Sequence, residues 1–411
     1  METNSLYIHI PFCTSKCSYC DFFSVPLGKD FAVCEKTQKL FENYVLALKR
    51  EISYYFQKFD IKLLKSIYIG GGTPSLLSVK LIKELFVFIE EKCKIDENAE
   101  ITMEANPQDI SEEFLEMLKL TKVNRLSVGV QCYNDEVLKI LQRRCDLKQV
   151  DFALNLIKEK WVSAGLSFSC DLISGLPYLS DEDFILGLKK VIDSGVNHIS
   201  LYSLMVEEGT LLEKQISREE VDYSDEVNEN QWILGRDFLE NQGFYQYEVS
   251  NFAKPGFESR HNTVYWHVEN YLGCGAGATG TVDDFRWNNN ADVEKYIDFW
   301  LDFKNNDIII PTEIENLSES EKEFEFLMMG FRLREGVKSS DYKKRFGGDL
   351  AFRLGYFKGD DKNLDAFQTG VFDKWMKKNL GDVEKTSDDC RFFLTGEGLL
   401  FLNQFLEEIL L

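Results

Sequence analysis

The first half of the chain alternates between two patterns of hydrophobic and polar residues. Short apolar runs of the kind found in buried strands are separated by amphipathic stretches with helical spacing. The predicted strands cover residues 6–10, 66–69, 100–103, 125–130, 168–173 and 198–204. The predicted helices between them include residues 41–56, 79–92, 112–118 and 135–142, with Asn134 and Ser180 as helix-capping residues. Strand–helix units in series need crossover connections and therefore predict a parallel sheet.

The number of these units predicts the architecture. Six units are fewer than the eight of a closed TIM barrel. We therefore predict an α/β fold with a partial (β/α)6 TIM-like barrel, and an open doubly wound sheet is the alternative. The barrel is assigned to residues 1–220 and a family-specific extension to residues 221–303. A composition change near residue 304, with a linker at residues 304–307, starts a predicted helical or winged-helix-like domain over residues 304–411.

Local signals in the last hundred residues support this C-terminal domain. Ser318 and Glu321 have the spacing of a capping box, and they precede a predicted helix at residues 324–333. The chain then ends with a strand-like run at 391–394, a turn at 396–398 and an apolar helix. Short strands and helices of this kind are typical of a small winged-helix-like module.

Glycine, acidic and amide residues stand where the predicted strands end. Residues 70–74, Gly-Gly-Gly-Thr-Pro, follow the second strand; Glu104 follows the third, Gln131 ends the fourth and Asp171 lies in the fifth. Ligands bind at this edge in barrels and in open α/β sheets. Glycines allow close backbone approach, and carboxylates accept hydrogen bonds or balance a positive charge. Taken singly, the same residues also fit a tight turn, a helix cap or a surface charge.

Three closely spaced cysteines follow the first predicted strand. Cys13, Cys17 and Cys20 have the spacing C-x3-C-x2-C, in a loop short enough to bring three thiolates together. Structural zinc usually takes four ligands, and an ordinary [4Fe–4S] cluster takes four cysteines. Three cysteines leave one iron open for a chelating molecule such as S-adenosylmethionine (SAM), which an electron from the cluster can split into a 5'-deoxyadenosyl radical. On spacing alone, a zinc loop completed by His9 or Cys34 stays equally open.

Composition narrows the function classes. The 411 residues include 47 Lys and Arg against 69 Asp and Glu, a formal net charge of −22, which argues against a nucleic-acid partner because such a partner needs a basic surface. The N-terminus lacks a signal-peptide pattern, and no apolar run approaches the roughly 20 residues that span a bilayer. Ten cysteines without an export signal indicate a reducing compartment, so we expect a cytoplasmic protein.

Taken together, the motifs resemble those of the radical SAM superfamily. The most similar group contains oxygen-independent coproporphyrinogen III oxidase and the HemW-type heme chaperones. The matching segments are residues 7–13, 17–22, 70–75, 129–131, 171–177, 247–253, 261–266, 271–273 and 275–278. The resemblance covers nearly the whole chain and is weakest beyond residue 300. It favours an iron–sulfur cluster over zinc.

The resemblance implies cofactors and the residues that hold them. The [4Fe–4S] cluster would be bound by Cys13, Cys17 and Cys20. The SAM site would be lined by Tyr7, Tyr19, Gly71, Gly72, Thr73, Glu104, Gln131, Arg143 and Asp171. The sequence His-Asn-x-x-Tyr-Trp resembles a heme-binding motif, in which an imidazole would bind iron and two aromatic rings would pack on the porphyrin; its residues are His261, Tyr265 and Trp266. Without the resemblance, this stretch would be interpreted as a structural loop with a hydrogen-bonded histidine.

Two functions fit this resemblance. The oxidase pattern has a further cysteine two residues after the third, where this chain has Phe22, and a longer segment before the cluster. Both differences favour a heme chaperone that binds heme and delivers it to acceptor hemoproteins, with membrane-associated ones among the candidates. The alternative is an enzyme of the coproporphyrinogen dehydrogenase type, which decarboxylates coproporphyrinogen III to protoporphyrinogen IX by radical chemistry. If SAM is cleaved, an electron donor is also a partner.

Three positions depart from the family pattern. The glycine-rich segment of the family commonly ends Gly-Ala-Gly-Ala-His-Gly, and this chain has Thr279 at the histidine position. Cys132 and Cys145 stand where serine and histidine are more usual. If the family histidine helps to bind heme or SAM, this chain must achieve that contact differently.

Overall fold

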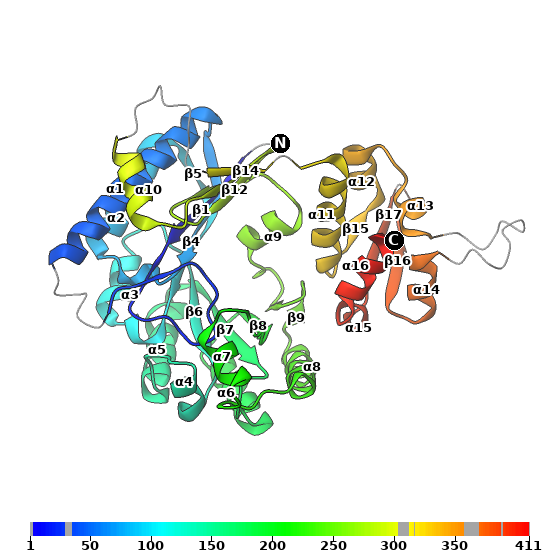
Figure 1. Cartoon of the computed structure of the whole chain (residues 1–411), viewed down its shortest axis with the longest axis horizontal. Helices are drawn as coiled ribbons and strands as arrows, with labels where there is room; N and C mark the ends of the chain where they lie inside the picture. Colours follow the sequence, from blue (N-terminus) through cyan, green and yellow to red (C-terminus); the bar gives the residue numbers. More distant parts are fainter. Residues whose placement is uncertain are drawn as a thin grey trace, which may run out of the picture. The chain divides into compact units, whose positions relative to one another are not determined.

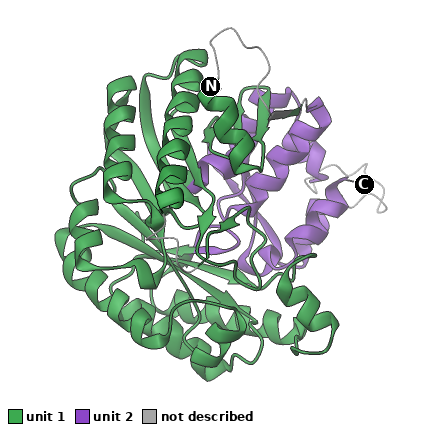
Figure 2. Ribbon diagram, turned by 60° about the vertical axis from the view of Figure 1, so that its left-hand side comes forward, with its two compact units in different colours: residues 1–245, 252–261, 269–316 green, residues 246–251, 262–268, 317–411 purple. Residues whose placement is uncertain are grey.

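The computed structural model describes residues 3–28, 35–302, 312–315, 317–356, 370–387 and 389–410. The chain divides into two compact units (Figure 2). Unit 1 consists of residues 1–245, 252–261 and 269–316, and unit 2 of residues 246–251, 262–268 and 317–411. The predicted linker at residues 304–307 lies outside the described residues. The predicted three-part division of the chain stays a prediction.

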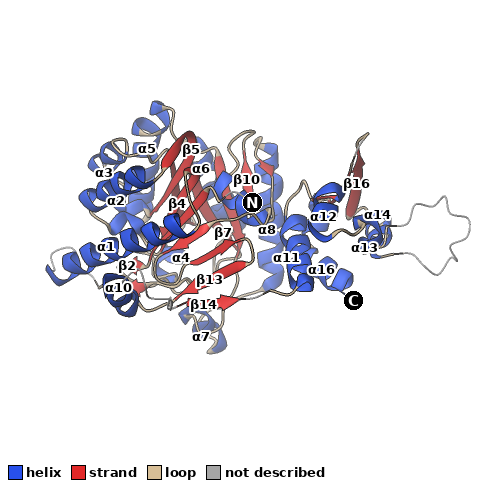
Figure 3. Ribbon diagram, turned by 90° about the horizontal axis from the view of Figure 1, so that it is seen from above, coloured by secondary structure: helices blue, strands red, loops and turns tan. Residues whose placement is uncertain are grey.

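Unit 1 is organised around a sheet with the strand order β11-β1-β4-β5-β6-β7-β8-β10-β9 (Figures 1 and 3). Its central strands are parallel and have the bounds Ser5–Ile10 (β1), Leu63–Gly71 (β4), Lys94–Ala105 (β5), Arg125–Gln131 (β6), Ser167–Ser174 (β7) and His198–Ser203 (β8). The outer strands are Leu272–Cys274 (β11), Asn251–Ala253 (β10) and Tyr245–Gln246 (β9). Because β11 and β9 form separate edges, the sheet does not close, which confirms the predicted partial barrel.

Helices connect the successive parallel strands from β1 to β8, as the predicted crossovers require. They are α1 Glu35–Lys58, α2 Val79–Lys92, α3 Glu112–Leu118, α4 Asp135–Ile140, α5 Leu147–Lys160 and α6 Asp181–Asp193. Unit 1 also contains α7 Leu211–Ser217, α8 Asp225–Asn241 and α10 Val293–Asp302, which follow later in the chain. The helix starts follow the capping signals in the sequence. Asn134 accepts hydrogen bonds from two amides at the start of α4, and Ser180 accepts one from Asp183 N at the start of α6.

The observed strands β4 and β5 are longer than the apolar runs from which they were predicted. β5 begins at Lys94, and its first residues are mostly exposed and polar. They nevertheless pair with β4 through the register Leu63↔Lys94, which shifts between Leu64 and Ser66. Backbone pairing of this kind leaves no hydrophobic signature, so the sequence could not indicate where these strands begin.

Several smaller elements lie outside the main sheet. A two-stranded pair, β2 Phe12–Cys13 and β3 Val25–Pro26, flanks the cysteine loop. A three-stranded sheet is formed by β12 Thr279–Val282, β13 Phe285–Asn289 and β14 Thr312–Glu315. Helix α9, Arg260–Trp266, carries the His-Asn-x-x-Tyr-Trp sequence. Single helical turns cover Pro74–Leu76 (η2), Pro107–Asp109 (η3) and Val162–Ala164 (η4).

Unit 2 has a hydrophobic core of its own. Its elements are α11 Glu319–Arg332, β15 Val337–Lys338, α12 Ser339–Phe346, α13 Leu350–Leu354, α14 Val371–Lys377, β16 Gly381–Lys385, β17 Cys390–Leu394, α15 Gly396–Leu399 and α16 Leu402–Leu410. The strands pair antiparallel in the order β15-β17-β16. The core gathers large side chains from several helices, including Phe331, Phe372, Trp375 and Phe405.

Two local predictions for unit 2 have different outcomes. The capping box of Ser318 and Glu321 is present at the start of α11. The turn predicted at residues 396–398 is wrong, because Thr395 accepts a hydrogen bond from Gly398 N and starts the short helix α15 there. Within the described ranges, no helix is both long and apolar enough to cross a membrane.

Candidate cofactor site at the carboxyl ends of the strands

The cysteine loop is held at the end of β1 by bonds to two other segments. Ser18 N donates to Leu141 O at 3.0 Å, and Leu212 N, at the start of α7, donates to Ser18 O at 2.8 Å. Cys13 Sγ lies 3.5 Å from Thr73 Oγ1 in the glycine-rich loop after β4. The loop is therefore fixed against the elements that carry the other predicted site residues.

The three predicted cluster ligands are free thiols. Cys13, Cys17 and Cys20 are half-buried, and burial raises the pKa of the Cys13 and Cys20 thiols. In the described part of the chain, no three His, Cys, Asp or Glu side chains form a preformed site for a single metal ion. A [4Fe–4S] cluster does not require such convergence, because each thiolate binds a different iron.

Glu104, at the end of β5, is bonded to the glycine-rich loop and to the neighbouring strand. Its carboxylate accepts from Gly71 N at 3.0 Å and from Tyr68 OH at 2.8 Å. Burial raises the pKa of Glu104 to about 7, and the nearby Asp171 adds to the rise. A bound positive charge would lower this pKa again, so the site suits a cationic ligand such as the sulfonium and amino groups of SAM.

The glycine-rich loop is packed tightly against β1 and β2. Gly72 N donates to Ile10 O at 2.9 Å, and Thr73 N donates to Phe12 O at 2.8 Å. A Cβ on Gly72 would lie 2.7 Å from Phe12 O, and Gly71 has a φ of +108°. Both positions therefore require glycine for close backbone approach.

Arg143 joins the cysteine loop to the strand ends. Its Nη2 donates to Asn106 Oδ1 at 2.7 Å and to Gly129 O at 2.6 Å, while Nη1 lies 3.7 Å from Cys17 Sγ. Asn106 Nδ2 in turn donates to Thr73 Oγ1 at 3.2 Å. Among the described residues, no acceptor lies near the buried Arg143 Nε. An orphaned donor of this kind fits a carboxylate or another acceptor on a bound ligand.

Gln131 on β6 and Asp171 on β7 complete the set of predicted site residues at the carboxyl ends of the strands, which we call the rim. The backbone of Gln131 has a φ of +70°, and the β6–β7 register shifts between Gly129 and Gln131. A Cβ on Gly129 would lie 2.8 Å from Gln131 Nε2, so the side chain folds back over this glycine. Asp171 accepts from Ser127 Oγ at 3.3 Å, and burial raises its pKa. Backbone strain at Gln131 is of the kind found where a side chain is positioned for function.

The two predicted tyrosines are both half-buried. The hydroxyl of Tyr7 lies 2.8 Å from His9 Nδ1, and His9 Nε2 lies 3.0 Å from Phe23 O after the cysteine loop. Burial raises the pKa of Tyr7 and of Tyr19, so both phenols are neutral. Tyr7 thus connects β1 to the cysteine loop through His9.

His261, the predicted heme ligand, lies inside the base of the barrel. Its side chain is fully buried, and Nδ1 lies 2.8 Å from Ser66 Oγ on β4. Glu100 accepts from His261 N at 2.9 Å and from Arg260 N at 3.0 Å, which fixes the start of α9. Burial lowers the pKa of His261 to about 3. The imidazole is therefore neutral, which is the form that binds iron.

Tyr265 and Trp266, the two predicted porphyrin contacts, belong to unit 2. Their ring centroids lie 6.4 Å apart in an edge-to-face arrangement. The Arg332 guanidinium stacks 4.5 Å from the centre of the Trp266 ring, and Arg332 Nε donates to Glu248 at 2.7 Å. Trp266 Nε1 is buried and has no hydrogen-bond partner in the described part of the molecule.

The residues at the three departures from the family pattern are all engaged within the chain. Thr279 begins β12, and its hydroxyl donates to Asn288 Oδ1. Cys132 Sγ lies 3.8 Å from Asn134 O, and burial raises the pKa of this thiol to about 12. Burial also raises the pKa of Cys145. Both thiols are therefore protonated at neutral pH.

Sequence reasoning missed three side chains that connect the rim residues. They are Tyr68, which binds Glu104, Asn106, which bridges Thr73 and Arg143, and Ser127, which binds Asp171. Two-residue alternation along the strands could have found Tyr68 and Ser127, because they lie two residues before Gly70 and Gly129. No sequence signal indicates the bridge made by Asn106, which joins segments far apart in the chain.

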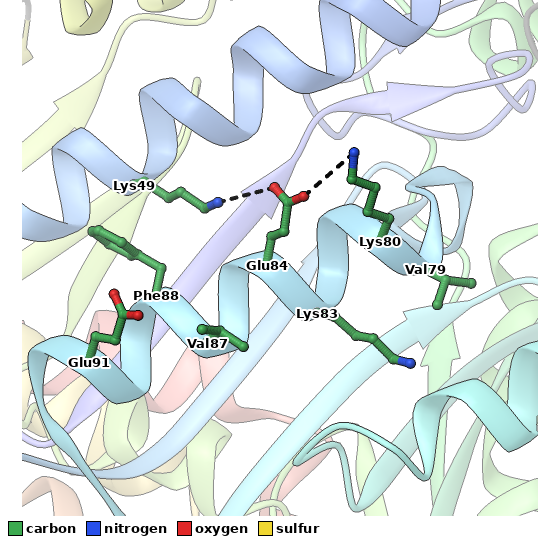
Figure 4. A pocket seen from close by; sticks show the side chains of 8 residues that line it. All are labelled: Lys49, Val79, Lys80, Lys83, Glu84, Val87, Phe88 and Glu91. Atoms are coloured by element: carbon green, nitrogen blue, oxygen red, sulfur yellow. Dashed lines mark hydrogen bonds and ion pairs between the residues drawn. The ribbon is translucent and has the colours of Figure 1, made fainter.

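A surface pocket elsewhere in unit 1 contains none of these residues. It lies between α1 and α2, where Glu84 accepts from Lys49 at 3.4 Å and pairs with Lys80 at 3.9 Å (Figure 4). Its other lining residues are Val79, Lys83, Val87, Phe88 and Glu91. The side chains that bear on cofactor chemistry lie instead at the strand ends.

The fold and the rim define a class of protein. A partial parallel barrel whose first strand leads into a C-x3-C-x2-C loop, with glycines and carboxylates on the following strand ends, is the architecture of radical SAM proteins. Residues 7–190 match the Radical SAM superfamily. Residues 317–368 match the HemN C-terminal domain.

Similar proteins narrow the class to one family. The heme chaperone HemW of Lactococcus lactis is 35% identical over 351 residues, which cover 84% of this chain and 86% of the relative. HemW of Synechocystis is 31% identical over 410 residues, which cover 98% of this chain and 95% of the relative. This chain therefore belongs to the HemW-type heme chaperone family of the radical SAM superfamily.

A solved structure supports the fold. Coproporphyrinogen III oxidase of Escherichia coli, a radical SAM enzyme, superposes with a TM-score of 0.78 over 99% of this chain and 90% of its own. The identity is 21%, so this similarity concerns the fold alone.

Membership of this superfamily implies a [4Fe–4S] cluster and SAM. The residues present fit both groups. Three thiols of the cysteine loop provide soft donors for iron. The orphaned Arg143 Nε is a donor and the half-buried Glu104 carboxylate is an acceptor, and both suit a ligand with the charged groups of SAM.

Proposed function

We propose that this protein is a cytoplasmic heme chaperone, which binds heme and passes it to acceptor hemoproteins. Membership of the HemW-type family is the observation that carries the proposal. Membrane-associated hemoproteins are candidate acceptors. A reducing compartment suits the free cysteines of the loop.

We propose that Cys13, Cys17 and Cys20 hold the [4Fe–4S] cluster. When bound, the cluster would supply the electron needed for reductive cleavage of SAM. The protein's own residues orient this pair. Arg143 lies between Cys17 and Asn106 and can hold the carboxylate of SAM, while Glu104 balances its positive charge. The remaining contacts are assigned to Tyr7, Tyr19, Gly71, Gly72, Thr73, Gln131 and Asp171.

We assign the axial heme ligand to His261, with Tyr265 and Trp266 as porphyrin contacts. The neutral imidazole supports this assignment, because a protonated one cannot bind iron. Nδ1 lies 2.8 Å from Ser66 Oγ, which fixes the orientation of the ring. Since His261 is fully buried, heme binding requires the start of α9 to be uncovered. The orphaned Nε1 of Trp266 supports a polar contact with a ligand on the same helix.

The test is a heme titration of the anaerobically reconstituted protein, followed through the Soret absorbance. We expect stoichiometric binding by the wild type and loss of the Soret band in His261→Ala. The matched control is His198→Ala, since His198 is equally buried and its Nδ1 lies 2.7 Å from Ser169 Oγ. Heme binding unchanged in His261→Ala, or lost equally in His198→Ala, would contradict the assigned ligand.

The runner-up function is oxygen-independent coproporphyrinogen III oxidation. The fold shared with the Escherichia coli enzyme is the observation that favours it. At the position of the additional cysteine in the oxidase pattern, Phe22 is 71% exposed and offers no thiol. Conversion of coproporphyrinogen III to protoporphyrinogen IX by the reconstituted protein with SAM and a reductant would establish this function instead.

A further inference from the structure

A second polar layer lies inside the barrel, below the rim. Side chains alternate along a strand, so a residue two positions before a rim residue points to the same inner face. Thr102 lies two positions before Glu104 on β5, and Ser169 lies two positions before Asp171 on β7. His198 lies two positions before Ser200, which contacts Asp171, on β8. On β6, Arg125 lies two residues before Ser127 and pairs in register with Thr102. This layer is separate from the residues assigned to the cluster and SAM.

Arg125 brings an uncompensated charge into this layer. Its side chain is 5% exposed, and Nη2 is buried without a hydrogen-bond acceptor. In the part of the chain that the structure describes, no carboxylate oxygen lies within 4.0 Å of its guanidinium. A buried charge without a partner is strongly destabilising, so a bound acceptor is expected.

Glu100 and Asp171, on the two strands that flank β6, are already engaged elsewhere. Glu100 accepts hydrogen bonds from Ser259 Oγ and from the first two amides of α9. Asp171 accepts from Ser127 Oγ, and although the Arg125 charge lowers its pKa, burial raises it by more. Neither side chain therefore neutralises Arg125.

The other neighbours of Arg125 are neutral. Burial and the Arg125 charge together lower the pKa of His261 to about 3, and the same two causes lower the pKa of His198. Thr102 Oγ1 is also buried and has no hydrogen-bond partner among the described residues. The layer thus combines one cation, one orphaned hydroxyl and two neutral imidazoles.

We propose that this layer binds a small monovalent anion between the Arg125 guanidinium and the Thr102 hydroxyl. A single cation matches a single negative charge. Thr102, His198 and His261 are all buried, so we restrict the proposal to an anion as small as a halide or formate. Such a site goes beyond the proposed function. None of the cluster or SAM residues takes part, and the anion would be held by Arg125 and Thr102 and not by His261, the proposed heme ligand that borders the layer.

The direct test is diffraction from crystals of the full-length protein soaked in bromide. We expect an anomalous peak within hydrogen-bond distance of Arg125 Nη2. An ordered water at this position, with no anomalous signal, would overturn the proposal. A second soak with formate distinguishes a site that also accepts carboxylates from one that accepts halides alone; both results support a small-anion site.

A solution experiment checks the same site through stability. The melting temperature of the wild type is expected to rise with the logarithm of bromide concentration, at ionic strength kept constant with gluconate, which is too bulky to enter. Arg125→Met should remove this dependence, and Arg125→Lys should retain part of it. The control Arg218→Met removes an exposed arginine and should behave like the wild type. Equal bromide dependence in Arg125→Met and in the wild type would contradict the proposal.

Discussion

Arg143 is the residue that connects the two halves of the candidate SAM site. It contacts Asn106 and Gly129 through Nη2 and approaches Cys17 through Nη1. On a helical pattern alone, an arginine at this position would be interpreted as solvent-exposed. The family resemblance assigns it to the SAM site, which stays a prediction. The bridge through Asn106 depends on three-dimensional contacts that leave no pattern in the sequence.

Replacing Arg143 should weaken SAM binding more than cluster assembly. Charge-assisted hydrogen bonds contribute about 1.5–3 kcal/mol, so Arg143→Met should lower SAM affinity by roughly 10- to 100-fold. Calorimetric titration of the reconstituted protein measures the affinity, and the iron content measures the cluster. The control is Arg144→Met, whose guanidinium lies 3.9 Å from Asp109. Unchanged SAM affinity in Arg143→Met would show that SAM binds elsewhere.

Glu104 should make SAM binding depend on pH. Its pKa of about 7 in the folded protein means that the carboxyl must lose a proton to balance the positive charge of SAM. As the pH is raised toward 7, we expect the affinity for SAM to increase by up to about tenfold per pH unit. Above pH 7 the affinity should level off. The rise should be absent in Glu104→Gln. Titrations from about pH 5.5 to about pH 8 test this expectation; an affinity that falls with rising pH would contradict it.

At the scale of elements, a buried carboxylate joins three segments of unit 1. Glu51 on α1 accepts from Gly275 N at 2.7 Å, from Asn289 Nδ2 at 2.6 Å and from the hydroxyl of Tyr296 on α10. Close by, Tyr44 OH donates to His9 O at 2.8 Å. These bonds fix the glycine-rich loop at residues 275–278 beside β1.

This network should make stability fall as pH rises. Burial raises the pKa of Glu51 from 4.5 to about 7, so the folded state holds the proton more tightly than the unfolded state. The free energy of unfolding should therefore decrease between about pH 4.5 and pH 7, by on the order of 3 kcal/mol from this group. Glu51→Gln should remove that part of the slope, which denaturant unfolding at several pH values measures.

The control for this experiment is Glu84→Gln, on the outer face of α2. Glu84 pairs with lysines at the surface and should leave the pH slope unchanged. A pH slope that persists unaltered in Glu51→Gln would indicate that Glu51 keeps its ordinary pKa in the folded protein.

The same elements show what the sequence could and could not predict. Helix α2 was predicted at its observed bounds, because an apolar stripe and the Ser78 cap define it locally. The exposed start of β5 was not predicted, since backbone pairing with β4 stabilises it. Rim residues such as Gln131 were identified by their position at strand ends. The Glu51 network was missed, because its partners come from segments more than 200 residues away.

At the scale of the whole molecule, the chain contains two hydrophobic cores. Unit 1 holds the parallel sheet and the cysteine loop, and unit 2 has its own core around Phe331 and Phe405. The His-Asn-x-x-Tyr-Trp sequence is divided between them, with His261 in unit 1 and Trp266 in unit 2. Sequence reasoning treated this motif as one segment, because the division of a short helix between two cores has no local signal.

Separate cores should respond separately to mutation. Phe405→Ala removes a fully buried ring and should destabilise unit 2 by about 3–5 kcal/mol. The iron content and the cluster spectrum of the reconstituted protein should stay unchanged, because the three cysteines belong to unit 1. Calorimetry and electron paramagnetic resonance on the same sample provide both readouts. A parallel loss of cluster would indicate that the two units fold as one.

The most direct test of the central claim compares heme binding with turnover in one preparation. The protein is reconstituted with iron and sulfide without oxygen, and then divided between a heme titration and an assay with coproporphyrinogen III, SAM and a reductant. We predict stoichiometric heme binding, transfer of that heme to an apo-hemoprotein, and no protoporphyrinogen IX. Formation of protoporphyrinogen IX by a protein that does not bind heme would contradict the account.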